Sequence, residues 1–218
     1  MSMIPGRGRF LTIEGIEGVG KTTQIARLSQ ALRERGIAHV VTREPGGTAL
    51  AERIRDIVLN ARDELLPPKA ELLLMFAARA VHLQNLVEPN LEAGRWVLCD
   101  RFTDATFAYQ GGGRGMDGDD IRVLETMVQG ARRPDLTVLL DAPVEQALQR
   151  ARQRNAGAGA AADRFESERA EFFERVRGAY RARAAAEPGR IASIDARDSA
   201  DRVAAGILDL LRTRSWIS

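Results

Sequence analysis

GIEGVGKT, residues 15–22, follows the apolar run FLTIE at 10–14 and precedes a stretch with helical periodicity. The spacing matches G-x-x-x-x-G-K-[ST], in which flexible glycines let backbone N–H groups converge on a phosphate at the positive end of a helix dipole. An ordinary glycine-rich turn is the alternative, but the strand before the motif and the helix after it favour a phosphate-binding loop. The stretch therefore predicts that the chain binds a nucleotide.

Two side chains of this loop carry the chemistry that a bound nucleotide needs. Lys21 is placed to bridge the β- and γ-phosphates, and the Thr22 hydroxyl is placed to ligate Mg²⁺. The loop alone leaves the reaction open. A regulatory GTPase would need an Asn-Lys-x-Asp type of segment on a late strand to read guanine, and the sequence contains none.

Outside the loop, short apolar runs alternate with longer helical patterns, which is typical of βαβ units and a mainly parallel sheet. We expect five strands, at 9–14, 39–42, 96–100, 136–140 and 190–194. We expect helices, the longest bent or in two pieces, at 21–35, 49–60, 69–92, 117–130, 144–154, 164–187 and 199–212. The prediction is an α/β fold with a five-stranded parallel sheet flanked by helices. The 218 residues suit one continuous domain with a mobile insertion.

Charge and composition argue against several classes of protein. The 32 Lys and Arg residues nearly balance the 30 Asp and Glu residues, which disfavours a general nucleic-acid or membrane-surface binder. The N-terminal segment lacks the apolar core of a signal peptide, and no stretch approaches the roughly 18 apolar residues of a membrane span. The single cysteine, Cys99, cannot form an internal disulfide. We expect a cytoplasmic protein with no nucleic-acid or membrane partner.

Arginines at the predicted sheet edge indicate a second anion site. Ligands of open α/β sheets bind at the carboxyl ends of the strands, and the guanidinium fork suits bidentate phosphate contacts. For each arginine alone, a solvated surface role is the alternative. In the run WVLCDR at 96–101, Asp100 lies where an acid holds Mg²⁺ through water or orients an acceptor phosphate. The arginines near this edge are Arg43, Arg55, Arg79 and Arg101.

Five segments in this order resemble the thymidylate kinase family: GIEGVGKTT (15–23), TREPGGT (42–48), FAAR (76–79), DRFTDATFAYQGGGRG (100–115) and DRFE (163–166). The resemblance runs across nearly the whole chain. It implies the P-loop nucleoside monophosphate kinase fold and transfer of the ATP γ-phosphoryl group to dTMP. The products would be dTDP and ADP, in a step toward dTTP and DNA synthesis. It also implies a Mg²⁺ requirement and a homodimer.

The resemblance assigns roles around the two phosphate sites. Glu17 resembles the acidic residue that hydrogen-bonds the 3′-hydroxyl of the acceptor sugar. A carboxylate so close to phosphates is repelled unless an arginine pairs with it. Pro45 shapes the turn that brings Arg43 to the acceptor phosphate, and Glu44 is a candidate to meet Mg²⁺ through water. The acceptor phosphate is expected on Arg43, Arg55 and Arg101. ATP is expected on Gly15, Ile16, Glu17, Gly18, Val19, Gly20, Lys21, Thr22, Thr23 and Arg150.

The base pocket is the most specific expectation. Phe76 and Arg79 lie three apart on one helix face, so an aromatic surface and a guanidinium can act together on a thymine ring. In the family the aromatic residue lies four places before the arginine, a position that Met75 occupies here. Met75 and Phe76 are therefore alternatives for facing the base. Gln110 resembles the residue that bonds ring N3–H, and Tyr109 the one packed against the deoxyribose.

A lid is predicted at about 150–166, in which the small residues NAGAGAAA (155–162) form a flexible connection. Arg150 and Arg154 share a helix face at this spacing, whereas Arg152 does not.

The loop has Gly18 where some relatives place an arginine. We therefore expect Arg154 and Arg164 of the lid to stabilise the transferring phosphoryl group, as in the bacterial type of the family. The predicted catalytic residues are Lys21, Asp100, Arg101, Arg154 and Arg164.

Two other functions stay open at the level of sequence. One is a kinase for a different small nucleotide, which would show no preference for dTMP. The other is a P-loop ATPase or GTPase that serves as a switch and hydrolyses its nucleotide slowly without a small acceptor. The arginine and glutamine of the predicted base pocket argue against the switch.

Overall fold

The computed structural model describes residues 7–60, 64–158, 164–165 and 168–218. Its centre is a sheet of five parallel strands in the order β2-β3-β1-β4-β5, which confirms the predicted fold class. Every predicted strand is present within two residues of its expected bounds. The strands are β1 (Phe10–Glu14), β2 (His39–Arg43), β3 (Trp96–Asp100), β4 (Leu136–Asp141) and β5 (Ile191–Asp195).

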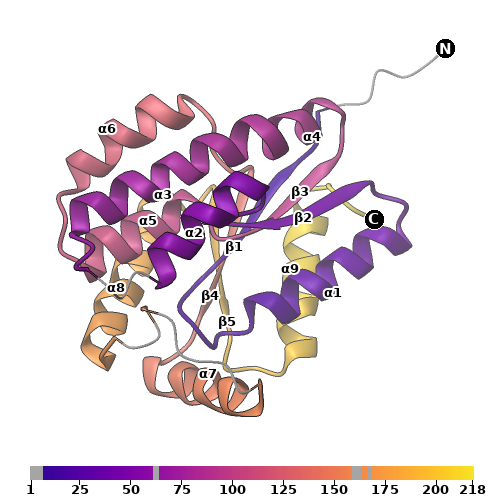
Figure 1. Ribbon diagram of the computed structural model, residues 1–218. Coiled ribbons are helices and arrows are strands. Elements are labelled where there is room, and N and C mark those ends of the chain that lie inside the picture. The colour runs from indigo at the N-terminus through magenta and orange to yellow at the C-terminus, as the bar shows by residue number, and fades with distance from the viewer. Residues whose placement is uncertain (1–6, 61–63, 159–163, 166–167) are drawn as a thin grey trace.

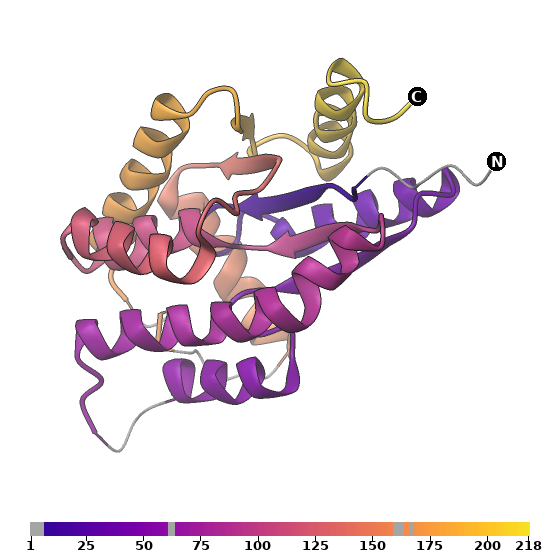
Figure 2. The same cartoon turned by 90° about the horizontal axis from the view of Figure 1, so that it is seen from above.

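Helices cover both faces of the sheet, as Figures 1 and 2 show. α1 (Lys21–Glu34) packs with α9 (Ala200–Thr213) on one face. On the other face, α3 (Pro68–His82) packs against both α2 (Ala49–Asn60) and α6 (Gly118–Gln129). The remaining helices are the π-helical segments η1 (Leu83–Val87) and η2 (Phe107–Gly113) and the α-helices α4 (Glu88–Glu92), α5 (Thr103–Thr106), α7 (Val144–Ala158) and α8 (Ala170–Ala186).

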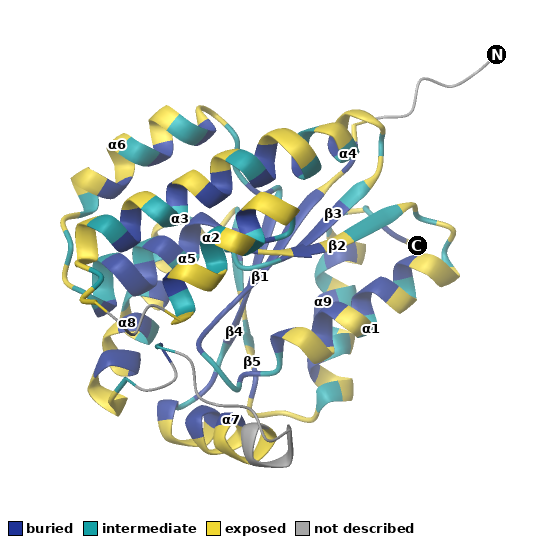
Figure 3. Cartoon of the chain, viewed as in Figure 1, coloured by how far each residue is buried: buried dark blue, intermediate teal, exposed yellow. Residues whose placement is uncertain are grey.

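Most of the length of the central strands is buried, which Figure 3 shows in dark blue. All five residues of β1 and the first five residues of β4 are buried, because helices cover both sides of the sheet. The edge strand β2 is mostly half-buried or exposed. The core therefore fixes β1 and β4 most firmly, and the phosphate loop starts directly from β1.

The helix predicted at 69–92 as bent or in two pieces is α3 and α4 joined by the π-helical segment η1, which confirms the prediction. Pro89, which has no N–H to donate, lies just after that segment. Two other helix expectations need correction. The predicted helix at 164–187 begins only at Ala170 as α8. The segment 103–113 was not predicted to be helical, yet it forms α5 and η2.

The run Gly111-Gly112-Gly113 explains why η2 was missed, since glycines usually disfavour a helix. Here they allow α8 to lie directly against η2. A Cβ on Gly112 would lie 2.6 Å from Ala179 Cβ, and one on Gly113 would lie 2.5 Å from a ring carbon of Phe172. Close packing between two helices therefore overrides the local preference.

In the part of the chain that the structure describes, no helix combines the length and the apolar character needed to span a membrane.

Candidate active site

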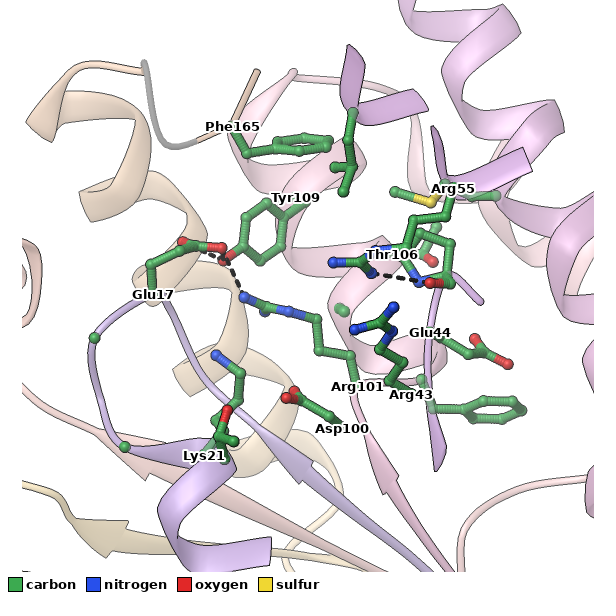
Figure 4. Close-up of a pocket in the computed structure, with 18 of the residues that line it drawn as sticks. Glu17, Lys21, Arg43, Glu44, Arg55, Asp100, Arg101, Thr106, Tyr109 and Phe165 are labelled. Atoms are coloured by element: carbon green, nitrogen blue, oxygen red, sulfur yellow. Dashed lines mark hydrogen bonds and ion pairs between the residues drawn. The ribbon is translucent and has the colours of Figure 1, made fainter. Parts of the chain in front are cut away.

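A cavity of about 620 Å³ opens at the carboxyl ends of β1, β2 and β3. This is the edge at which open parallel sheets bind ligands. Figure 4 shows side chains from the loop after β1, from the ends of β2 and β3, and from η2 pointing into it. The predicted site residues that line it are Glu17, Gly18, Gly20, Lys21, Thr22, Thr23, Arg43, Glu44, Pro45, Arg55, Met75, Arg79, Asp100, Arg101, Tyr109, Gln110, Arg150 and Arg154.

The phosphate loop has the backbone that its glycines were expected to allow. Gly15, Gly18 and Gly20 all have positive φ, at 134°, 78° and 96°. The loop also lies directly against α7, since a Cβ on Gly18 would lie 1.8 Å from the carbonyl oxygen of Ala147. The side chains of Ile16 and Val19 belong to the core, so these two predicted ATP contacts can act only through their backbone.

The Lys21 side chain is hydrogen-bonded to the backbone of the phosphate loop. Its Nζ donates to the carbonyl oxygens of Gly15 and Ile16 at 3.1 and 2.9 Å. Burial lowers the pKa of Lys21 to about 8, and the charge of Arg101 acts in the same direction. The ammonium group is thus buried near a second cation, an environment that favours an incoming polyanion.

Arg101 joins the loop to the acceptor side of the cavity. Its guanidinium donates to the Gly15 carbonyl oxygen at 2.8 Å and to Glu17 Oε1 at 2.7 Å, and it lies 4.8 Å from the centre of the Tyr109 ring. The Tyr109 hydroxyl donates to the same Glu17 carboxylate at 2.7 Å (Figure 4). The expected pairing of Glu17 with an arginine is therefore present. The backbone of Arg101 has φ of 71°, an uncommon conformation that occurs often at active sites.

Asp100 lies beside the loop with one oxygen unused. Its Oδ1 is buried and has no hydrogen-bond partner within the described ranges. Thr22 lines the same cavity. A carboxylate oxygen with no donor, in the same cavity as a threonine hydroxyl, fits the hard oxygen donor set and the bound waters that Mg²⁺ prefers.

Glu44, the other predicted metal residue, is engaged elsewhere. Its Oε2 accepts from Arg79 Nε at 2.7 Å, and its Oε1 bonds His82 Nδ1 at 2.9 Å. Burial raises the pKa of Glu44, but Arg79 and His82 outweigh burial and hold it below its usual value. Glu44 therefore holds Arg79 in place. Its predicted contact with Mg²⁺ stays a prediction.

The arginines predicted to hold the acceptor phosphate come together on one side of the cavity. Figure 4 shows Arg43 and Arg55 on the same side as Arg101. Arg55 Nη1 donates to the Pro45 carbonyl oxygen at 2.9 Å, and the half-exposed Arg43 pairs with Glu52 at 2.9 Å. Guanidinium groups from three elements thus face one pocket, and that of Arg101 also bonds the phosphate loop.

Arg79, the arginine predicted to read the base, is fixed on three sides. Arg79 Nε donates to Glu44, and Nη2 donates to Thr106 Oγ1 at 2.9 Å. Its guanidinium carbon lies 4.7 Å from the centre of the Phe76 ring. Nη1 is buried and bonds no group in the described part of the chain. One donor of a rigid guanidinium is left for a ligand.

The structure separates the two alternatives for the aromatic position. Met75 lines the cavity, whereas Phe76 lies in the core with Leu72 and Ile121. Phe76 was predicted to contact substrate, and its observed place, beneath Arg79, gives it an indirect role. Met75 is a polarizable side chain that can pack against a ring.

Gln110 and the lid residues complete the pocket. Gln110 Nε2 donates to Glu71 Oε1 at 2.8 Å. Arg150 and Arg154 line the cavity together, as their spacing predicted, and Arg150 Nη1 donates to the Ala196 carbonyl oxygen at 2.9 Å. The second half of NAGAGAAA, residues 159–162, lies outside the described residues, as do Asp163 and Glu166 of DRFE.

Arg164 is not brought to the phosphate loop. Its guanidinium pairs with Glu71 at 2.6 Å, below the base pocket. Its neighbour Phe165 lines the cavity and packs edge-on against Tyr109, with ring centres 5.7 Å apart. Sequence reasoning quoted DRFE yet assigned nothing to Phe165, and it missed Glu71 and Thr106 entirely. The aromatic residue next to a lid arginine was the one signal available for Phe165.

A parallel sheet with a phosphate loop after β1 and an arginine-lined second site facing that loop defines a P-loop phosphotransferase that acts on a small anionic acceptor. The thymidylate kinase family model matches residues 13–207. Thymidylate kinase of Chromohalobacter salexigens is 55% identical over 212 residues, with 96% of this chain and 98% of the relative covered. That of Alkalilimnicola ehrlichii is 50% identical over 214 residues, with 97% of each covered.

A solved structure shows the same relationship. The crystal structure of thymidylate kinase from Ehrlichia chaffeensis superposes with a TM-score of 0.73 at 31% identity, covering 94% of this chain and 99% of that one. The chain belongs to the thymidylate kinase family. The resemblance seen in the five sequence segments is confirmed. Membership of this family favours a kinase over a P-loop switch.

Proposed function

We propose that the chain transfers the γ-phosphoryl group of ATP to dTMP and releases dTDP and ADP. The observation that carries the proposal is the pair of groups facing the cavity opposite the phosphate loop. Arg79 Nη1 is a buried donor without a partner among the described residues, and Gln110 has its amide nitrogen engaged by Glu71. A thymine O4 acceptor and an N3–H donor match the donor and the remaining amide oxygen.

Transfer requires two polyanions to be held end to end. The loop amides and Lys21 take the ATP phosphates, while Arg43, Arg55 and Arg101 neutralise the acceptor phosphate. Because the transition state of phosphoryl transfer is loose, positioning and charge neutralisation supply most of the rate enhancement. Glu17, held by Arg101 and Tyr109, is placed to fix the sugar hydroxyl of the acceptor.

Thr22 and Asp100 would hold Mg²⁺, the latter through a bound water that satisfies its unused Oδ1. When bound, the ion supplies charge neutralisation across the β- and γ-phosphate oxygens. Arg150 and Arg154, which both line the cavity, supply further positive charge from the lid side, and we infer that Arg154 acts on the transferring group.

Preference for thymine follows from the hydrogen-bonding capacity of the pocket. Arg79 can only donate, so the amino group of cytosine in place of O4 leaves two donors facing each other. Uracil differs from thymine by one methyl group, worth roughly 1–3 kcal/mol at most. We expect strong discrimination against dCMP and weaker discrimination against dUMP.

A coupled assay of ADP release tests this function. ATP consumption should rise when dTMP is added and should rise far less with dCMP or dGMP, with dUMP between them. Lys21→Ala should abolish turnover while the thermal unfolding curve stays close to that of the unmodified chain. A rate of ATP consumption that does not change when dTMP is added, or an unchanged kcat in Lys21→Ala, would overturn the proposal.

The family resemblance supports further expectations about the whole molecule. We infer one kinase domain over 1–218 with a lid at about 150–166, acting in the cytoplasm as a homodimer. Large apolar side chains exposed on the neighbouring helices α2, α3 and α6 support a second copy as the partner. They are Leu50, Ile57, Leu73, Val123 and Met127.

A further inference from the structure

Glu71 is a buried carboxylate at the base pocket that does not line the cavity. It lies on α3, two turns before Arg79, and its side chain is fully buried. Its Oε1 accepts from Gln110 Nε2 at 2.8 Å. Any effect of Glu71 on a bound base must therefore pass through Gln110, which does line the cavity.

Two cations face the same carboxylate. Arg164 Nη2 lies 2.6 Å from Glu71 Oε2, and Arg114 Nε lies 3.6 Å from Oε1. The negative charge of Glu71 is thus paired inside a buried site rather than left alone there. An ionised carboxylate has no hydrogen to donate and can only accept.

This chemistry selects one orientation of the Gln110 amide. With Nε2 toward Glu71, the amide oxygen is left for the cavity. The reversed amide would set two oxygen acceptors against each other at hydrogen-bonding distance, and burial makes such a pair costly. No group in the described part of the chain donates to the Gln110 side-chain oxygen, so this acceptor is available to a ligand.

We propose that Glu71 is a positioning residue that sets the preference for a base with an N3–H, by locking the Gln110 amide with its oxygen toward the base. The inference rests on the proposed function. Thymine and uracil carry a hydrogen on N3, which the oxygen can accept. Cytosine carries an unprotonated N3, which only a reversed amide could satisfy.

Glu71→Gln tests the lock. A glutamine at 71 offers both a donor and an acceptor, so either orientation of Gln110 finds a partner. The ratio of kcat/KM for dTMP to that for dCMP should fall about tenfold in Glu71→Gln, the scale of one correctly paired buried polar group. Glu125→Gln makes the same change in a buried carboxylate that pairs with Arg133 outside the cavity. It should keep the ratio.

A double-mutant cycle decides whether the effect passes through Gln110. In the Gln110→Ala background, Glu71→Gln should leave the dTMP to dCMP ratio within about twofold, because the amide that it unlocks is gone. An equal loss for both substrates in Glu71→Gln, or the same drop in ratio with Gln110 removed, would overturn the inference. Failure of the unmodified chain to phosphorylate dTMP would instead overturn the proposed function.

The structure of the unmodified chain with dTMP gives a second test that needs no variant. Glu71 should keep its hydrogen bond to one terminal atom of the Gln110 amide, with base N3 within hydrogen-bonding distance of the other. A Gln110 side chain that leaves Glu71 when dTMP binds would contradict the lock, even where Glu71→Gln does not fold.

Discussion

Glu44 is a buried carboxylate that holds two polar side chains where the base is proposed to bind. Glu44 holds both Arg79 and His82, whose Nε2 in turn bonds Thr42 Oγ1 at 2.8 Å. Each of these polar side chains is buried, so none has water to replace a lost partner. The Arg79 guanidinium, which we propose reads the base, is thereby held in place by the protein itself.

Glu44→Gln should destabilise the chain strongly. It removes the charge that Arg79 needs in the core, and breaking a buried pair in this way costs about 3–5 kcal/mol. Urea unfolding measures the loss. Asp209→Asn, which removes an exposed pair with Arg212, should cost at most about 1 kcal/mol. Equal effects of the two substitutions would contradict the role given to Glu44.

Glu14 should make stability depend on pH. It is buried at the end of β1, where burial and the charge of Asp104 raise its pKa to about 8. The folded chain therefore keeps a proton on Glu14 that the unfolded chain loses near pH 4.5, the ordinary value. This contribution to stability is full below about pH 4.5 and is lost as the pH rises toward 8.

Unfolding free energies measured from pH 5 to 8 should therefore decline less steeply in Glu14→Gln than in the unmodified chain. The exposed Glu145→Gln should leave the slope unchanged. A slope that Glu14→Gln does not alter would show that Glu14 is not the responsible group.

At this scale the sequence identified the residues that carry a motif. Lys21, Arg43, Asp100 and Arg101 were predicted from patterns and Gln110 from the family resemblance, and the structure brings all five to one cavity. Glu71 and Thr106 were missed because they act through Arg79 or Gln110. A residue that contacts only another site residue, and not the ligand, belongs to no motif with a recognisable spacing.

At the scale of elements, the phosphate loop is held against α7 as well as carried by β1. The carbonyl oxygen of Ala147 occupies the space that any Cβ at position 18 would take. This chain has no room for a larger side chain at that position without moving α7. The phosphate loop is therefore in direct contact with α7, the helix that carries Arg150 and Arg154.

Gly18→Ala should lower kcat by at least about a hundredfold, because a shift of roughly 1 Å in a positioning element costs that much. It should also destabilise the fold, since φ at this position is 78°. Steady-state kinetics with dTMP measure the effect. Gly20→Ala offers a comparison, because a Cβ there meets nothing within 4 Å, although φ is also positive. A milder loss in Gly18→Ala than in Gly20→Ala would contradict the contact.

Strands were easier to predict than helices. β1 and β4 are buried on both faces, so their apolar runs mark them directly. The helical character of 103–113 depends on packing against α8, and this tertiary contact cannot be recognised from the local sequence.

At the scale of the whole molecule, the exposed apolar side chains of α2, α3 and α6 predict an interface between two copies. Val123→Glu combined with Met127→Glu should convert a dimer to a monomer, because two charges would be buried at its centre. Sedimentation measures the mass. Arg202→Glu on α9, across the sheet, should leave the dimer intact. A dimer that persists in the double variant would place the interface elsewhere.

We propose that one cavity holds both nucleotides end to end, with ATP on the loop and thymidylate among the arginines. A crystal structure with dTMP and a non-hydrolysable ATP analogue would show both nucleotides at once. We expect the dTMP phosphate on Arg43, Arg55 and Arg101, with the thymine edge on Arg79 and Gln110. A dTMP bound outside this cavity, or with its base turned away from Arg79, would contradict it.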